Sequence, residues 1–173
     1  DQAESLRRFG HKLWDVIHGR KIKSVVFRSD IALENACIYL AEGLLLSTYV
    51  FDKYKSEKQD RHLKEIHIDD KNVSDENITT LYKTVNANFI ARDLVNEPPA
   101  KLTATDLSNS IISLGKKYGF NTTVLEKAKI QSLKMGGLLS VNLGSESPPT
   151  FNILEWKPKG AKNKKPVVLI GKG

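Results

Sequence analysis

Lys172 is the residue of this sequence that is best placed to do chemistry, because of the residues that precede it. It follows a compact apolar run at residues 167–170 and lies in the segment Gly171-Lys172-Gly173. Such a run is typical of a strand buried on both faces, and ligands of α/β proteins bind at the carboxyl ends of strands. Desolvation or an adjacent dication there favours a neutral lysine amine, which can act as a base or as a metal ligand. On composition alone, a solvated lysine is the simpler interpretation.

The other residue types that carry catalysis form no recognisable motif. The four histidines are His11, His18, His62 and His67, and none belongs to a His-Glu-x-x-His zinc pattern. His11 and His18 could share one helix face, but we expect both to be surface or half-buried residues rather than metal ligands. The sequence has no Gly-x-Ser-x-Gly elbow. The Gly-Lys-Gly segment also lacks the upstream glycine and the following Ser or Thr of a phosphate loop.

Hydrophobic periodicity predicts three helices and two strands before Pro98. Apolar residues at three- and four-residue steps predict a helix that ends near Gly19. The lone Cys37 lies on the apolar side of the second helix, so we expect a buried structural thiol, and a single cysteine fits a reducing compartment. Ser74 is the expected N-cap of the third helix, which Pro98 and Pro99 stop. The remaining predicted elements are strands at 24–27 and 65–69, a helix at 31–46 and a surface connection at 51–61.

After the prolines, helices and strands alternate. Thr105 is the expected cap of a helix that Gly119 ends. Strands are predicted at 121–125, 138–142, 150–156 and 167–170, with a short helix at 127–134. Gly136-Gly137 and Gly144-Ser145 flank the predicted strand at 138–142, and we expect turns there. The alternation predicts an α/β fold with a largely parallel or mixed sheet.

Composition and charge limit the classes of function. The 173 residues are 40% hydrophobic and 27% charged, which is typical of a globular chain. No run of about 18 apolar residues is present, so we expect no membrane span. The net charge is +7, but a lysine-rich loop at 157–166 carries five of those charges and leaves the rest near +2. We expect a solvated loop, with a phosphate-contacting patch as the alternative. The five lysines are Lys157, Lys159, Lys162, Lys164 and Lys165.

Five ordered blocks of the sequence resemble the leucyl aminopeptidase family, also called cytosol aminopeptidase or M17 metallopeptidase. Upstream, the residues at 41–46 with Tyr49 and the segment Phe51-Asp52-Lys53-Tyr54-Lys55 are similar to the end of that family's N-terminal domain. The five blocks are Phe89-Ile90-Ala91-Arg92-Asp93-Leu94-Val95-Asn96-Glu97-Pro98-Pro99, Leu102-Thr103, Met135-Gly136-Gly137-Leu138-Leu139, Gly144-Ser145 with Pro148-Pro149, and Val168-Leu169-Ile170-Gly171-Lys172-Gly173.

The resemblance implies a chain of three parts. Residues 1–73 are expected to be the later part of a macro-domain-like N-terminal α/β domain, and 74–94 a connecting helix. Residues 95–173 are expected to begin the catalytic metallopeptidase domain, an α/β domain with a mixed sheet. The family releases N-terminal amino acids, with a leucine-type preference, from peptide substrates. It is usually a cytoplasmic homohexamer.

The resemblance also assigns a metal role to Lys172. The family uses two divalent ions, Zn²⁺, Mn²⁺ or Mg²⁺, which activate a water molecule, and its metal-binding lysine falls on Lys172. All other ligands and catalytic residues are expected after Gly173, so no catalytic residue is expected within this chain and the 173 residues alone are predicted inactive. The alternative is DNA binding through the 157–166 loop or nucleotide binding by the macro-like domain. No glycine-rich phosphate cradle is visible in residues 1–73.

Overall fold

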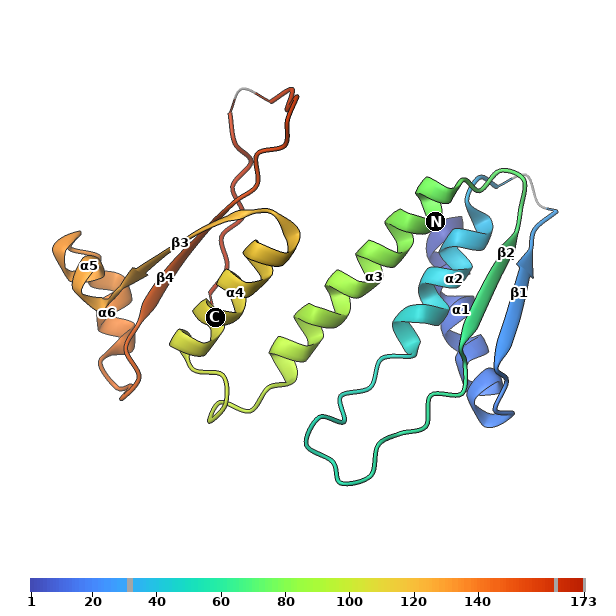
Figure 1. Cartoon of the computed structure of the whole chain (residues 1–173), viewed down its shortest axis with the longest axis horizontal. Coiled ribbons are helices and arrows are strands. Elements are labelled where there is room, and N and C mark those ends of the chain that lie inside the picture. The colour runs from blue at the N-terminus through green and yellow to red at the C-terminus, as the bar shows by residue number, and fades with distance from the viewer. Residues whose placement is uncertain (31–32, 164, 173) are drawn as a thin grey trace. The chain divides into compact units, whose positions relative to one another are not determined.

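The computed structural model describes residues 1–30, 33–163 and 165–172, and within it the chain forms two compact units. The first unit is Asp1–Asn96 and the second is Glu97–Gly173. Each combines helices with a two-stranded sheet, so the predicted α/β class is confirmed (Figure 1). The strands form two separate small sheets among the described residues, one parallel and one antiparallel.

Two helices of the first unit pack with their backbones in contact. These are α1 (Gln2–Gly19), which confirms the predicted first helix, and α2 (Ala36–Ser47), which overlaps the range predicted for the second and ends one residue beyond it. Residues 31 and 32, where that helix was expected to begin, lie outside the described residues. A Cβ added at Gly43 would lie 2.6 Å from the carbonyl carbon of Arg7, and one added at Gly10 would lie 2.9 Å from the amide nitrogen of Leu44. Only glycine permits so close a crossing.

A parallel pair of strands and α3 complete the first unit. Strand β1 (Ser24–Arg28) pairs with β2 (Glu65–Asp69). Both strands were predicted from the sequence. Helix α3 (Asp75–Asn96) begins where expected, since the amide of Asn77 donates to Ser74 Oγ at 3.2 Å. Cys37 is buried, as predicted, and burial raises the pKa of its thiol. The buried cluster of this unit is Ile17, Phe27, Cys37, Ala41, Leu44, Leu81 and Val85.

The second unit is built around an antiparallel pair of strands. Its helix α4 (Ala104–Tyr118) ends at Gly119, which has φ of 79° as a C-cap requires. Strand β3 (Asn121–Glu126) pairs with β4 (Thr150–Glu155), and both were predicted. Two short helices lie between them, α5 (Lys127–Ser132) and α6 (Gly136–Asn142).

The N-cap of α4 is Thr103 rather than the expected Thr105. The amide of Asp106 donates to Thr103 Oγ1 at 3.3 Å, while the Asp106 carboxylate accepts from the amide of Thr103 at 3.0 Å. This reciprocal capping box satisfies two helix-terminal donors. The hydrogen bonds to Asp106 lower the pKa of its carboxyl group. Thr105 lies inside the first turn, where its side chain cannot perform that role.

Residues 138–142 are helical, so the predicted strand there is wrong. The amide of Leu139 donates to the carbonyl of Met135 at 3.2 Å, the four-residue step of a helix. A short apolar run does not distinguish a strand from a buried helical turn by its pattern. The glycines at 136 and 137 lie within α6, so the turn expected there is also absent.

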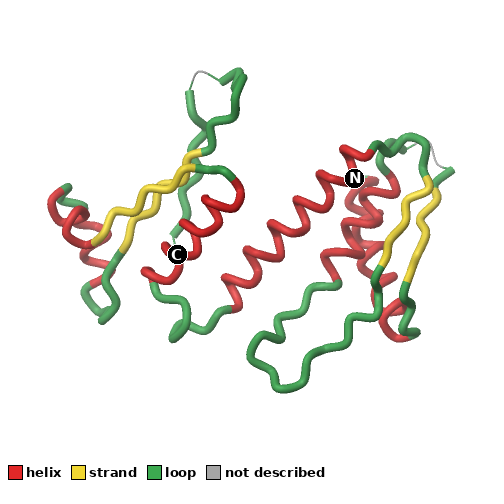
Figure 2. The backbone as a smooth tube through the Cα atoms, in the orientation of Figure 1, coloured by secondary structure: helices red, strands yellow, loops and turns green. Residues whose placement is uncertain are grey.

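The strand predicted at 167–170 is likewise absent from the described structure. These four residues pair with no strand, and their exposed fractions run from 70% at Val168 to 95% at Ile170. Figure 2 draws the described residues after β4 as loop. A β-strand needs a neighbour for its backbone hydrogen bonds, and the apolar pattern cannot supply one.

Candidate functional site

Lys172 is exposed and follows the unpaired 167–170 segment. Gly173 lies outside the described residues. In the part of the chain that the structure describes, no group of three or more His, Cys, Asp or Glu side chains is arranged to hold a metal ion. A single amine cannot hold two cations, so the described residues do not by themselves fit a dinuclear metal centre.

The histidines lie in different local settings, and only the rings of His18 and His62 lie near each other among the described residues, with centroids 6.4 Å apart. His11 Nδ1 lies 2.8 Å from Ser47 Oγ, and the ring of His18 stacks on Trp14 with centroids 5.0 Å apart. His67 Nε2 lies 3.1 Å from a carboxylate oxygen of Glu65 on the surface. His11 is exposed and His18 half-buried, as expected for both residues.

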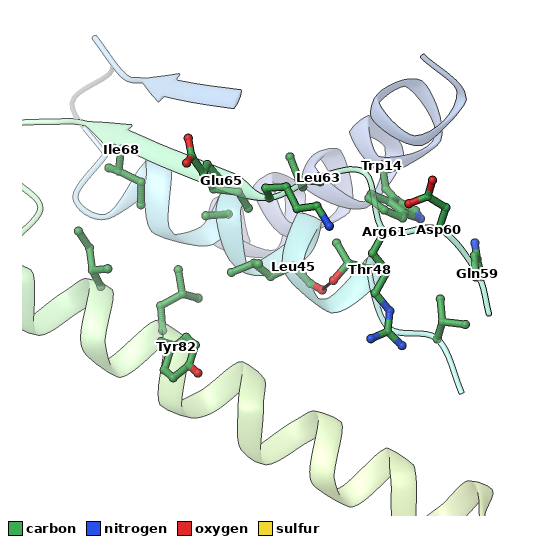
Figure 3. A pocket seen from close by; sticks show the side chains of 16 residues that line it. Trp14, Leu45, Thr48, Gln59, Asp60, Arg61, Leu63, Glu65, Ile68 and Tyr82 are labelled. Atoms are coloured by element: carbon green, nitrogen blue, oxygen red, sulfur yellow. Dashed lines mark hydrogen bonds between the residues drawn. The ribbon is translucent and has the colours of Figure 1, made fainter. Parts of the chain in front are cut away.

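The first unit contains a cavity of about 300 Å³. Its walls come from α1, α2, β2, α3 and the connection at 48–64, and Trp14 is the residue that α1 contributes (Figure 3). Apolar side chains such as Leu45 and Ile66 form most of the wall, while Gln59, Asp60 and Arg61 bring polar groups. This cavity could not be predicted from the sequence, because its residues come from five separate segments with no shared motif.

A buried carboxylate, Asp52, organises the connection that carries those polar groups. Its side chain is buried and accepts from the amide of Gln59 at 3.2 Å and from Arg61 Nη2 at 3.4 Å. The ammonium group of Lys58 donates to the carbonyl oxygen of Asp52, and to that of Lys53 at 3.0 Å. A connection that composition alone marks as a surface loop therefore has a fixed path around one acidic residue.

The lysine-rich loop is exposed wherever the structure describes its lysines. Lys157, Lys159, Lys162 and Lys165 are exposed, and Lys164 lies outside the described residues. The loop turns at Gly160, which has φ of 79°, and the amide of Ala161 donates to the carbonyl of Pro158 at 3.2 Å. The exposure agrees with the expected solvated loop.

Comparison with known proteins adds to this geometry. Residues 89–173 match the family described as "Cytosol aminopeptidase family, catalytic domain". A probable cytosol aminopeptidase of Chlorobaculum tepidum is 44% identical over 153 residues, covering 81% of this chain and 30% of that protein. A probable cytosol aminopeptidase of Clostridium perfringens is 33% identical over 181 residues, covering 98% of this chain and 37% of that protein.

Solved structures show the same fold. A tomato leucine aminopeptidase mutant superposes with a TM-score of 0.78 at 19% identity, covering 87% of this chain and 32% of that chain. The bottromycin maturation enzyme BotP in complex with Mn superposes with a TM-score of 0.75 at 24% identity, covering 91% of this chain and 34% of that chain. The likeness at these identities is one of fold.

The fold is therefore that of an N-terminal portion of the leucine aminopeptidases. With the matched catalytic region and the curated relatives, the chain belongs to the cytosol aminopeptidase family. It spans about a third of the length of the curated relatives it matches. The comparisons do not support the DNA-binding or nucleotide-binding alternative. Among the described residues, no helix combines the length and apolar character needed to cross a bilayer.

Proposed function

We propose that this chain is the N-terminal portion of a dinuclear-metal aminopeptidase that releases N-terminal amino acids, with leucine-type preference, from peptides. The observation that carries the proposal is the match of residues 89–173 to the catalytic domain of the cytosol aminopeptidase family. Curated relatives of the same description support it, at 33% to 44% identity. The proposed protein acts in the cytoplasm as a homohexamer.

Within that enzyme, Lys172 is proposed to be a metal ligand. It belongs to the matched region and is exposed, so its amine is accessible to groups outside the described residues. Its part in the reaction is to present a neutral amine, whose lone pair is available only after the proton has left. Two bound divalent ions, Zn²⁺, Mn²⁺ or Mg²⁺, supply Lewis acidity and an activated water in such a centre. The Mn complex of a protein with the same fold is consistent with this choice of metals.

The proposal is tested in the full-length polypeptide that contains this sequence. Lys172→Ala is compared with Lys165→Ala, a neighbouring exposed lysine with no proposed ligand role. We expect Lys172→Ala to lower the bound metal per subunit and to reduce hydrolysis of leucine p-nitroanilide by at least about 100-fold, because even outer partners of metal ligands contribute 10–100-fold. Lys165→Ala should retain the wild-type metal content and the wild-type rate of hydrolysis. Full metal content and full activity in Lys172→Ala would refute the assignment of this residue.

The 173 residues alone provide the complementary test. Incubated with leucine p-nitroanilide and Mn²⁺, they should give no turnover above the metal-only blank, because the described residues offer one of the proposed ligands. Robust turnover that a chelator abolishes would show that the chain holds a complete site of its own.

A further inference from the structure

Tyr49 lies at the centre of a cluster of contacts that the proposed chemistry does not use. It is in the connection at 48–64, two residues beyond the end of α2. Its hydroxyl donates to Asp93 Oδ1 at 2.8 Å and accepts from Asn96 Nδ2 at 3.2 Å. Its ring lies 5.3 Å from that of Phe89, centroid to centroid. One side chain therefore makes both polar and aromatic contacts with α3.

Arg92 adds a second attachment between the same elements. Its guanidinium lies 3.9 Å from the centroid of the Tyr49 ring, within the range of a cation–π contact. Its Nη1 donates to the carbonyl oxygen of Leu46 at 2.9 Å. That carbonyl is in the last turn of α2, where helix carbonyls lack a partner within the helix. Arg92 thus caps α2 from α3.

The α3 residues of this cluster share one face of the helix. Phe89, Arg92, Asp93 and Asn96 are separated by three- and four-residue steps, which bring side chains together on a helix surface. Asn96 also donates to the carbonyl of Arg92 at 2.8 Å and so holds the final turn. Hydrogen bonds and ring contacts are directional. They can therefore fix the rotation of a helix about its axis, whereas apolar contacts alone fix it only weakly.

Apart from these directional contacts, α3 is held by limited apolar packing, so the contacts can have a measurable effect on its position. Leu81 and Val85 are its two buried residues, both in its first half. The cavity of about 300 Å³ lies beside that contact, and Ile78 and Tyr82 on the same helix are 42% and 72% exposed. Because voids remove dispersion contacts from the residues around them, this packing is weaker than in a filled core.

We propose that Tyr49 is the hub of a latch, formed with Arg92, Asp93 and Asn96, that fixes the rotation and register of the last two turns of α3. The family match begins at residue 89, so the latch joins the first residues of the catalytic region to the segment that precedes it. Thr48 and Val50, the neighbours of Tyr49, line the cavity, so the latch also ties one cavity wall to the end of α3. Partial burial, followed by the bond to Asp93, raises the pKa of the Tyr49 phenol, in keeping with the hydroxyl acting as a donor.

Hydrogen exchange on the 173-residue chain tests the latch without any measurement of peptidase activity. Tyr49→Phe removes the hydroxyl and keeps the ring, while Tyr49→Leu removes both. We expect the amides of residues 93–96 to exchange about fivefold faster in Tyr49→Phe, the effect of losing about one net hydrogen bond, and faster again in Tyr49→Leu. Amides of residues 81–85 should be unchanged. The control is Tyr82→Phe, on the same helix but 72% exposed, which should match the wild type.

A double-mutant cycle keeps the test decisive if Tyr49→Leu unfolds the unit. Asp93 is exposed, so Asp93→Ala should fold, and it removes the same bond from the other side. If the latch exists, Tyr49→Phe combined with Asp93→Ala should exchange within about twofold of either single variant, because the coupled contact is lost only once. Multiplicative effects of the two changes, or wild-type exchange in Tyr49→Phe, would overturn the proposal.

Discussion

The two units of this chain are built from the same kinds of element but bury their side chains very differently. Asp1–Asn96 encloses a cluster of seven buried residues that includes Leu44 at 0% exposure. Among the described residues from Glu97 onward, the buried positions are Ser108, Gly115, Ile130 and Pro149. Burial of apolar area is the main favourable term in folding. We therefore expect the first unit to hold most of the stability of the chain.

Large apolar side chains are exposed at the surface of the second unit, which also shows that its core is small. On β4, Phe151 and Ile153 are 38% and 46% exposed, and Leu169 in the terminal segment is 94% exposed. Exposed apolar residues in such number are typical of surfaces that another element covers. The sequence carries the apolar pattern of a core in both units, but the described structure completes a core in only one.

The most severe test of this contrast removes one fully buried side chain from each unit. Leu44→Ala and Ile130→Ala should each cost about 2–5 kcal/mol, the usual range for large-to-small changes in a core. Ile130→Ala should unfold the second unit, which has little other buried apolar surface, while Leu44→Ala loosens the first without unfolding the second. Hydrogen exchange read separately over 1–96 and 97–172 measures this. An equal response of both units to either change would show that they unfold as one.

The helix crossing of the first unit can be broken without deleting a side chain. Gly43→Ala places a Cβ against the backbone of Arg7, so we expect a loss of about 3 kcal/mol from overpacking. Gly19→Ala is the matched control, since a Cβ there meets nothing within 4 Å. It should change the free energy of unfolding by less than about 0.5 kcal/mol, a typical surface effect. Urea unfolding monitored by far-ultraviolet circular dichroism compares the two. Equal losses would mean that the close crossing is not what Gly43 provides.

Local hydrogen bonds at the start of α4 stabilise the second unit by a smaller amount. Thr103→Ala removes the side-chain half of the capping box and should cost about 1 kcal/mol. Thr105→Ala, two residues along, should be neutral or slightly stabilising because alanine favours helix. Hydrogen exchange of the α4 amides measures both variants. If Thr105→Ala is the damaging change, the cap has been assigned to the wrong threonine.

The pH dependence of the same cap gives the smallest effect. The pKa of Asp106 is lowered by hydrogen bonds from the Thr103 hydroxyl and amide, so the folded state prefers the ionised carboxylate. That stabilisation is complete above the unfolded pKa of about 3.9 and is lost as pH falls through the lower folded value. Wild type should therefore lose protection in α4 below about pH 4 more than Asp106→Asn does. Glu146→Gln, an exposed change in the same unit, should not alter the profile.

Much of the secondary structure could be predicted because its causes are local. The periodicity of α1, the β-branched run of β1, the Ser74 cap and the Gly119 stop each depend on residues a few positions apart. Thr103 could also have been found, since Thr103-x-x-Asp106 has the spacing of a capping box with aspartate in place of the usual glutamate. Two threonines, Thr103 and Thr105, lie near the start of this helix, and the prediction selected the wrong one as the N-cap.

The family could be assigned from the sequence, because ordered blocks of residues carry it. The burial of Cys37 could be predicted as well, because apolar periodicity marks the inner face of a helix. Which distant polar groups come into contact depends instead on the three-dimensional fold. The hydrogen bond between Tyr49 and Asp93 joins residues 44 positions apart, and Asp52 accepts a hydrogen bond from Arg61, nine positions away. The tertiary structure also decided that residues 167–170 have no strand beside them among the described residues. Such contacts depend on the path of the whole chain, whereas propensity and capping act within one or two turns.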